Sequence, residues 1–207
     1  MTAPVVLLEH PADGVALIRL NRPEARNALN MEVRRVLAQH VADATEDPNV
    51  RCLIFAGSDK VFAAGADIII AGESARFGQP EVKIGITPGG GGTQRLLRAA
   101  GKFNAMRICL TGDMFTAAQM QAMGVVCEVV PDAETEKRAL VLAQQIAALP
   151  PLAVQQIKEV ILAGEDGSLE EGLRLEAKAI QLMFSSQDQK EGMAAFIEKR
   201  KPTFQGR

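Results

Sequence analysis

The chain has 207 residues, of which 47% are hydrophobic and 23% are charged, and its formal net charge is −2 at pH 7. This length and balance fit one globular domain, or one domain with a small addition, and exclude disordered, collagen-like and rod-like coiled-coil chains. The small net charge, with Lys and Arg dispersed, argues against a nucleic-acid partner. No apolar run approaches the roughly 20 residues that a membrane span needs. The first ten residues lack the basic and apolar regions of a signal peptide, so we expect a cytoplasmic protein without a membrane partner.

The cysteines and histidines predict neither a metal site nor a disulfide framework. Cys52, Cys109 and Cys127 lie far apart in apolar sequence, whereas structural disulfides and zinc sites use closely spaced pairs. His10 and His40 are isolated, which argues against a Ser-His-Asp or Cys-His hydrolase. We therefore expect carboxylates and backbone amides to carry any chemistry, with no metal or redox cofactor.

The first fifty residues predict a β-hairpin followed by a helix. Apolar runs at 5–9 and 15–20 flank a turn signal and indicate two short antiparallel strands. Apolar residues then recur at helical spacing over 30–46, with Asn30 as the candidate N-cap.

Two further apolar runs, 51–56 and 67–71, have the composition of strands in a parallel sheet. Only about ten residues without a helical pattern separate them, whereas parallel neighbours need a crossover of roughly a dozen or more residues. Either these strands are not parallel neighbours or a connecting unit is absent.

From residue 93 onward the pattern is mostly helical, so an α/β N-terminal part precedes a helical C-terminal part. Ser168 and Glu171 have the spacing of a capping box. The predicted elements are helical segments at 93–101, 102–112, 116–124, 132–148, 151–163, 168–184 and 188–200, and a strand at 125–130.

A glycine run, Gly89 to Gly92, precedes the first of these helical segments. It matches neither a Walker loop nor a G-x-G-x-x-G fingerprint. The run offers exposed backbone N–H groups near a helix start, or it is merely a structural turn.

Two other segments carry candidate chemistry. Glu81 follows a Gly and a Pro among apolar residues, where a carboxylate can serve as general acid or base; the alternative is an exposed Glu at a turn. In the small-residue loop 62–67, backbone N–H groups could face a thioester oxygen as an oxyanion hole.

Several segments, taken in order, carry a more specific signal: NRPEARNALN (21–30), FAAGADI (62–68), ARFGQPEVKIGITPGGGGTQRL (75–96), LTG (110–112), AMGVVCEVVP (122–131) and FIEKRKPTFQGR (196–207). Together they resemble the enoyl-CoA hydratase/isomerase family, the crotonases, over nearly the whole chain. The resemblance implies an α/β fold with a crotonase-like ββα spiral core at 1–131 and a helical C-terminal trimerisation region at 132–207.

The resemblance also implies roles for individual residues. Glu81 matches a catalytic glutamate that exchanges a proton with the acyl α-carbon. The N–H of Ala66 matches an oxyanion-hole donor, and the N–H of Gly89 matches a donor that holds the reacting water. Phe196 and Lys199 match positions that reach a neighbouring subunit's acyl chain and CoA phosphate. The full set of implied substrate- and CoA-binding positions is Ala25, Arg26, Ala28, Ala64, Asp67, Ile68, Phe196 and Lys199.

The sequence departs from the family between residues 68 and 69. Family members carry there a segment on the order of fifty residues, somewhat more than one βαβ unit. That segment holds the second oxyanion-hole N–H and the first catalytic glutamate. Either the deletion is genuine, with Ala66-Asp67-Ile68 at the junction, or the protein carries a segment that this 207-residue sequence lacks; the intact motifs on both sides favour the second explanation.

We therefore predict a lyase of fatty acid metabolism, an enoyl-CoA hydratase that adds water across the 2,3 double bond of a 2-enoyl-CoA thioester. CoA enters only as part of the substrate, and a homo-trimer or hexamer is expected. The alternatives are a Δ3,Δ2-enoyl-CoA isomerase that uses a single glutamate, and a catalytically silent CoA-binding or assembly subunit.

Overall fold

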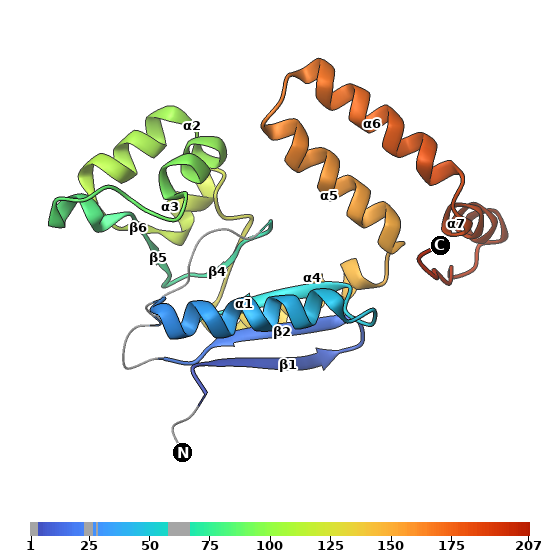
Figure 1. The fold of residues 1–207 in the computed structure, drawn as a ribbon, viewed down its shortest axis with the longest axis horizontal. Coiled ribbons are helices and arrows are strands. Elements are labelled where there is room, and N and C mark those ends of the chain that lie inside the picture. The colour runs from blue at the N-terminus through green and yellow to red at the C-terminus, as the bar shows by residue number, and fades with distance from the viewer. Residues whose placement is uncertain (1–3, 23–26, 28, 58–66) are drawn as a thin grey trace. The chain divides into compact units, whose positions relative to one another are not determined.

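The computed structural model describes residues 4–22, 27, 29–57 and 67–207 (Figure 1). The chain divides into two compact units, Met1–Leu142 and Ala143–Arg207. The boundary expected from the sequence, between residues 131 and 132, stays a prediction.

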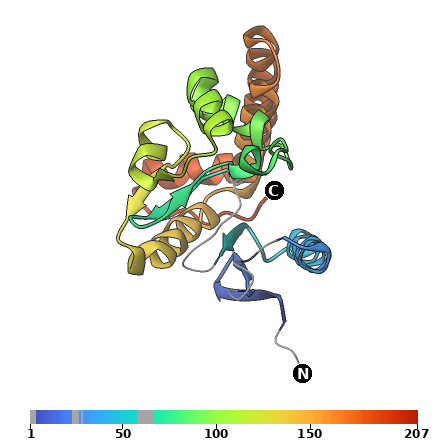
Figure 2. The same ribbon diagram turned by 90° about the vertical axis from the view of Figure 1, so that its left-hand side faces the viewer.

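The first unit begins with a three-stranded sheet. Strands β1 (Val6–Ala12) and β2 (Val15–Leu20) form the predicted antiparallel hairpin, and β3 (Cys52–Ala56) pairs with β2 in parallel, in the order β1-β2-β3. Helix α1 (Met31–Glu46) lies along one face of this sheet (Figures 1 and 2).

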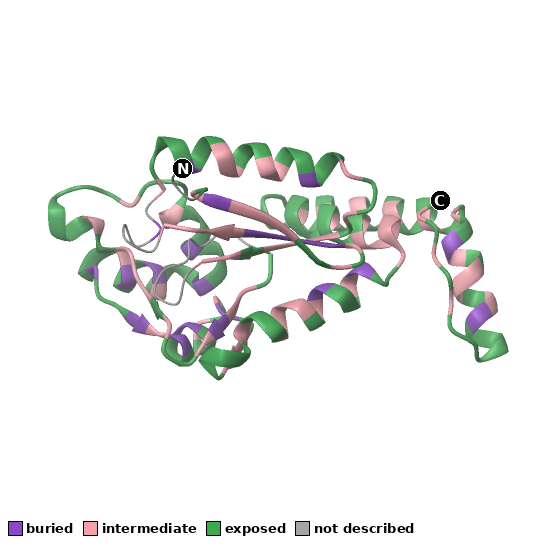
Figure 3. Cartoon of the chain, turned by 90° about the horizontal axis from the view of Figure 1, so that it is seen from below, coloured by how far each residue is buried: buried purple, intermediate pink, exposed green. Residues whose placement is uncertain are grey.

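Strand β2 is central and buried on both faces, because residues 15–18 are all inaccessible to solvent (purple in Figure 3). Ile18 packs with Val6 and Val33 beneath α1, so the helix covers the apolar face that its spacing predicted. The predicted N-cap is also confirmed: the Asn30 side chain accepts the N–H of Val33 at 2.9 Å, which satisfies one donor of the first turn.

Two small sheets follow. Strand β4 (Ile70–Gly72) pairs in parallel with β7 (Glu128–Val130), and β5 (Arg76–Phe77) pairs antiparallel with β6 (Phe115–Thr116). The strand expected at 67–71 thus begins later than predicted. Among the described residues β3 and β4 belong to different sheets, which agrees with the first of the two alternatives, that these strands are not parallel neighbours.

Helical elements lie between strands β5, β6 and β7 and follow β7. They are the 3₁₀ helix η2 (Pro80–Ile84), α2 (Gly92–Thr111), α3 (Ala117–Ala122), the 3₁₀ helix η3 (Asp132–Glu134) and α4 (Thr135–Ala147).

Helix α2 is interrupted at Gly101, whose φ of 74° and ψ of 165° are not helical. This break separates the two helical segments that were predicted as consecutive stretches. Around α2 lies the core of this part of the unit, which buries residues from β4, α2, β6, α3 and the turn before β7. They are Ala71, Leu96, Ala105, Ile108, Phe115, Ala117, Met120 and Val126.

The second unit contains a helical hairpin, α5 (Pro151–Glu165) and α6 (Leu169–Phe184), followed by α7 (Gln187–Glu198) (Figure 1). The two hairpin helices approach closely at paired glycines, since a Cβ on Gly172 would lie 3.7 Å from the Cα of Gly164. Within this unit α5 and α6 leave large apolar side chains exposed: Ile157, Ile161, Leu162, Leu169, Leu173, Ile180, Leu182 and Phe184.

Within the described residues, no single helix has the length and apolarity to cross a membrane. One bent pair of helices, Asp132–Ala147 with Pro151–Glu165, meets the criteria by length and composition only.

Candidate active site

The segment that carries Glu81 is placed by the pairing of β5 with β6. Phe77 lies opposite Phe115 in this pair, and the chain then passes Gly78. A Cβ on Gly78 would lie 2.7 Å from the carbonyl oxygen of Asp113, so only glycine allows this close approach. The backbone therefore enters η2, and with it Glu81, in a fixed position against the turn that follows α2.

The far end of η2 is fixed to the same turn. Gly112 ends α2 in the left-handed conformation, with a φ of 63°, and a Cβ there would lie 3.0 Å from a methyl group of Val82. The Lys83 ammonium forms an ion pair with the Asp113 carboxylate at 3.5 Å. The short helix is thus held at both ends by contacts with the C-terminal end of α2.

The Glu81 carboxylate is half-buried and has a specific neighbour. The Gln79 amide lies 3.2 Å from both carboxylate oxygens in the orientation that turns its nitrogen towards them. Burial, and then the charge of Glu81, raise the pKa of the Cys109 thiol on α2, which places the carboxylate near that helix. Glu81 is therefore not the fully exposed turn residue of the alternative interpretation. Sequence reasoning gave Gln79 no role.

The glycine run forms a tight turn into α2. The N–H of Gly92 donates to the carbonyl of Gly89 at 3.0 Å, and the carbonyl of Gly91 accepts the N–H of Arg95 at 2.9 Å. Gly90 and Gly91 have φ of 60° and 82°, a conformation that glycine adopts far more readily than other residues. Consecutive left-handed residues explain why this turn needs glycines.

Gln79 links Glu81 to this turn. A Cβ on Gly92 would lie 2.8 and 3.0 Å from the two polar atoms of the Gln79 amide, so the amide packs directly against the backbone at the start of α2. The structure thus joins Glu81 and the turn that begins at Gly89 through a single side chain. A carboxylate beside a glycine-lined helix start can transfer a proton next to a polar ligand group.

The other predicted site residues fall into three groups. Asp67 and Ile68 lie before β4, separated from it by Ile69, and the Ile68 side chain is 44% exposed. Phe196, which is 82% exposed, and Lys199 lie at the C-terminal end of α7 in the second unit. The remaining predicted positions lie outside the described residues: Ala25, Arg26, Ala28, Ala64 and Ala66.

Comparison with known proteins decides the family. A profile described as enoyl-CoA hydratase/isomerase matches residues 10–68 and 66–207, which is nearly the whole chain. The chain belongs to the enoyl-CoA hydratase/isomerase family. A probable enoyl-CoA hydratase of Mycobacterium tuberculosis is 36% identical over 257 residues, covering 99% of this chain and 99% of the relative. The 2,3-dehydroadipyl-CoA hydratase of Escherichia coli is 34% identical over 244 residues, covering 92% of this chain and 96% of that relative.

Solved structures confirm the α/β crotonase fold for this family member. The crystal structure of enoyl-CoA hydratase subunit I from Geobacillus kaustophilus matches with a TM-score of 0.92 and 31% identity, covering 98% of each chain. Whether the C-terminal helices form a trimerisation region stays a prediction.

The comparisons also bear on residues 66–68. The two matched parts of the family profile overlap there, so Ala66, Asp67 and Ile68 fit the family on both sides of the break. The alignment with the mycobacterial relative spans 257 positions while this chain has 207 residues, so at least 50 positions are occupied only by the relative. This number agrees with the segment that the sequence motifs indicate as absent.

Proposed function

We propose that this chain is an enoyl-CoA hydratase that adds water across the 2,3 double bond of a 2-enoyl-CoA thioester. One observation carries the proposal: in a member of this family, the half-buried Glu81 carboxylate is held by Gln79 against the glycine turn that opens α2. Several relatives are named as enoyl-CoA hydratases, which supports the same reaction class.

In the proposed reaction, the water oxygen bonds to C3 of the acyl chain, the C2=C3 π bond breaks with its electrons moving towards C2 and the thioester oxygen, and C2 takes a proton from the Glu81 carboxyl, which is restored by the proton that the water loses. Glu81 exchanges this C2 proton as the general acid. The negative charge that develops on the thioester oxygen is stabilised by the N–H of Ala66, and the N–H of Gly89 holds the water. A backbone donor aimed at such an oxygen contributes about 10²–10³ in rate.

The absent segment sets the expected rate. By the family resemblance, this segment would supply a second oxyanion-hole N–H and a second glutamate. Loss of an oxyanion-hole donor lowers the rate about 10²–10³-fold. Loss of a general acid or base lowers it about 10²–10⁴-fold. We therefore expect slow hydration by the 207-residue chain. A single catalytic carboxylate is also compatible with the isomerase alternative. The reaction products distinguish the hydratase from the isomerase.

The test is a spectrophotometric assay with a 2-enoyl-CoA, in which hydration removes the ultraviolet absorbance of the conjugated thioester. Glu81→Gln is expected to lower kcat about 10²-fold or more, whereas Glu73→Gln, an exposed carboxylate after β4, leaves it unchanged. Conversion of a 3-enoyl-CoA to the conjugated isomer without hydration would favour the isomerase. CoA binding without either reaction would favour the silent subunit, and full activity of Glu81→Gln would overturn the assignment of that residue.

We also propose an oligomeric state and a cellular location for the chain. The many exposed large apolar side chains of α5 and α6 favour a homo-oligomer, a trimer or hexamer, because a chain rarely leaves large apolar surfaces in water. Sedimentation velocity on the full chain tests this; a monomer at micromolar concentration would exclude it. A cytoplasmic location, and a reaction without metal or redox cofactor, remain predictions from the sequence.

A further inference from the structure

Helix α7 ends in an unfavourable backbone conformation. Lys199 has a φ of 54° and a ψ of 39°, and the N–H of Arg200 donates to the carbonyl of Ala195 at 3.0 Å. This pattern is a Schellman motif, in which the left-handed position is usually glycine because a Cβ is disfavoured there. Neighbouring contacts have to offset the cost of this conformation at a residue with a Cβ.

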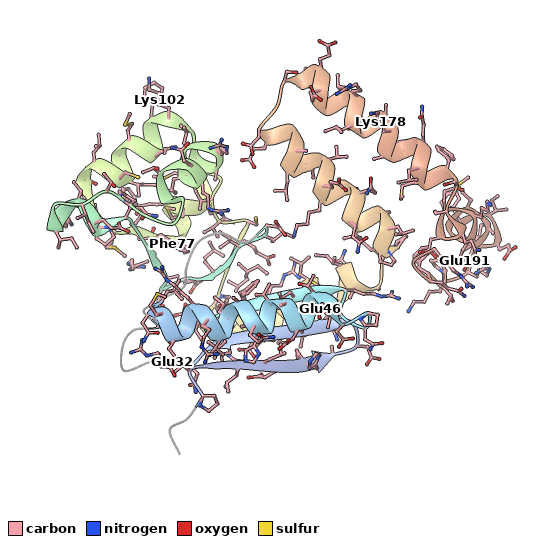
Figure 4. All side chains as sticks on the ribbon, in the orientation of Figure 1. Glu32, Glu46, Phe77, Lys102, Lys178 and Glu191 are labelled. Carbon is pink, nitrogen blue, oxygen red and sulfur yellow. The ribbon has the colours of Figure 1, made fainter. Side chains whose placement is uncertain are left out.

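The neighbouring contacts centre on Arg200. Its guanidinium donates to both carboxylate oxygens of Glu191, at 2.6 and 2.8 Å, and through Nε to Glu198 at 2.6 Å. Glu191, labelled in Figure 4, also accepts the N–H of Thr203 at 2.8 Å. Arg200 and then the Thr203 N–H lower the pKa of Glu191 from 4.5 to about 2.

The residues beyond Arg200 are fixed as well. The carboxylate of Asp188, only 3% exposed, accepts the N–H groups of Gln205 at 2.7 Å and Gly206 at 2.8 Å. In return, the N–H groups of Gln187 and Asp188 donate to the backbone oxygen of Arg207 at 2.7 and 3.1 Å. The segment 200–207 is thus held against α7 at both of its ends.

These contacts separate the roles of two adjacent cations. Arg200 is engaged by Glu191 and Glu198, whereas Lys199 is exposed and has no ion-pair partner in the part of the chain that the structure describes. A cation that is exposed and held by a rigid backbone is preorganised for an external anion, because little conformational freedom is lost on binding.

We infer that Glu191 is a positioning residue: by holding Arg200 it keeps Lys199 in the left-handed conformation, from which the ammonium would reach a phosphate of CoA, the role that the family resemblance implies for Lys199. This inference rests on the proposed function. In this inference Glu191 acts only through Arg200 and Lys199.

The experiment compares the binding of CoA and of pantetheine, which lacks the phosphates, to the full chain by isothermal titration calorimetry. Lys199→Ala and Glu191→Gln are each expected to weaken CoA binding about tenfold, the size of one charge-assisted contact, and to leave pantetheine binding unchanged. The double variant should be no weaker than Lys199→Ala, because both changes remove the same contact. Arg200→Lys, which retains the charge without the two-pronged geometry, should reproduce Glu191→Gln.

Glu171→Gln is the matched control, since Glu171 forms an ion pair with Arg174 on α6, away from the end of α7. It should bind CoA like the parent chain, and thermal melts verify that each variant is folded. Unchanged CoA affinity in both Glu191→Gln and Arg200→Lys would overturn the inference, as would an equal loss of pantetheine binding. A parent chain that binds no CoA at all would instead overturn the proposed function.

Discussion

The guanidinium of Arg19 on β2 donates two parallel hydrogen bonds, each 2.9 Å long, to the carboxylate of Glu136 on α4. The two residues are 117 positions apart and lie on opposite sides of the break at residues 66–68. Arg19 also contacts Glu9 on β1 at 3.3 Å. The N-terminal sheet is therefore tied to a helix from beyond the break, even though the chain lacks about fifty residues found in its relatives.

This ion pair should contribute measurably to stability. We expect Glu136→Gln to lower the free energy of unfolding by about 0.5–1 kcal/mol, the upper range for a partly exposed pair with this two-pronged geometry. Urea denaturation measures the change, with a double-mutant cycle to Arg19→Gln isolating the pair. Glu134→Gln, which removes only an exposed contact with Lys137, should change stability less. Equal effects of the two variants would contradict a specific role for the β2–α4 contact.

The Glu191 carboxylate predicts an acid-sensitive contribution to stability. Its pKa is lowered to about 2, chiefly by Arg200, so the folded state favours its ionised form. The stabilisation is fully present above the ordinary value of 4.5 and is lost as the pH falls towards 2. Thermal melts between pH 6 and 2 should therefore show a smaller decrease for Glu191→Gln than for the parent chain. Parallel curves for the two proteins would contradict the assignment, and Glu171→Gln serves as the exposed carboxylate control.

Alanine substitutions at Gly91 and Gly89, in the glycine turn before α2, should differ in their effect on stability. Gly91 has a φ of 82° and its Cβ would meet the Arg95 side chain at 3.2 Å, so Gly91→Ala should destabilise the chain by about 1–2 kcal/mol. Gly89 has no atom within 4 Å of an added Cβ and lies outside the left-handed region, so Gly89→Ala should change stability by less than about 0.5 kcal/mol. Urea titrations compare the two, and equal destabilisation would show that the turn is not held in this conformation.

Periodic and capped elements could be predicted from the sequence, and elements without periodicity could not. Helix α1 and its cap at Asn30 follow from helical spacing and a side-chain oxygen at the right position. The two-residue strands at 76–77 and 115–116 were not predicted, because so short a pairing leaves no alternating pattern. The 3₁₀ helix at 80–84 was missed for the same reason, since five residues are too few for a periodic signal.

The candidate site was predictable only where a motif carried it. Glu81 was singled out by its motif, and the structure places it beside the glycine turn. Gln79 received no role, although it stands two residues before Glu81, because only the packed backbone shows that its amide reaches Gly92. Likewise, nothing local in the sequence links Glu191 to Arg200, which are nine residues apart across the end of α7.

The absent segment gives the sharpest test of the proposed activity. Inserting the corresponding fifty or so residues of the mycobacterial relative between residues 68 and 69 should restore the second oxyanion-hole donor and the second glutamate that the family resemblance implies for this segment. Because these two groups act at different atoms of the same transition state, we expect kcat for hydration to rise about 10⁴-fold or more. The assay is the loss of 2-enoyl-CoA absorbance, measured alongside the 207-residue chain.

Two controls separate catalysis from folding in that experiment. An insert whose catalytic glutamate is replaced by glutamine restores the strand and helices but not the acid–base group, so it should recover only part of the rate. Glu81→Gln in the restored chain should again lower kcat about 10²-fold or more, because proton delivery to C2 still depends on this carboxylate. If the restored chain hydrates its substrate no faster than the 207-residue chain while melting cooperatively, the segment does not complete this active site. The Glu81 region would then serve a different reaction, with the isomerase as the first candidate to assay.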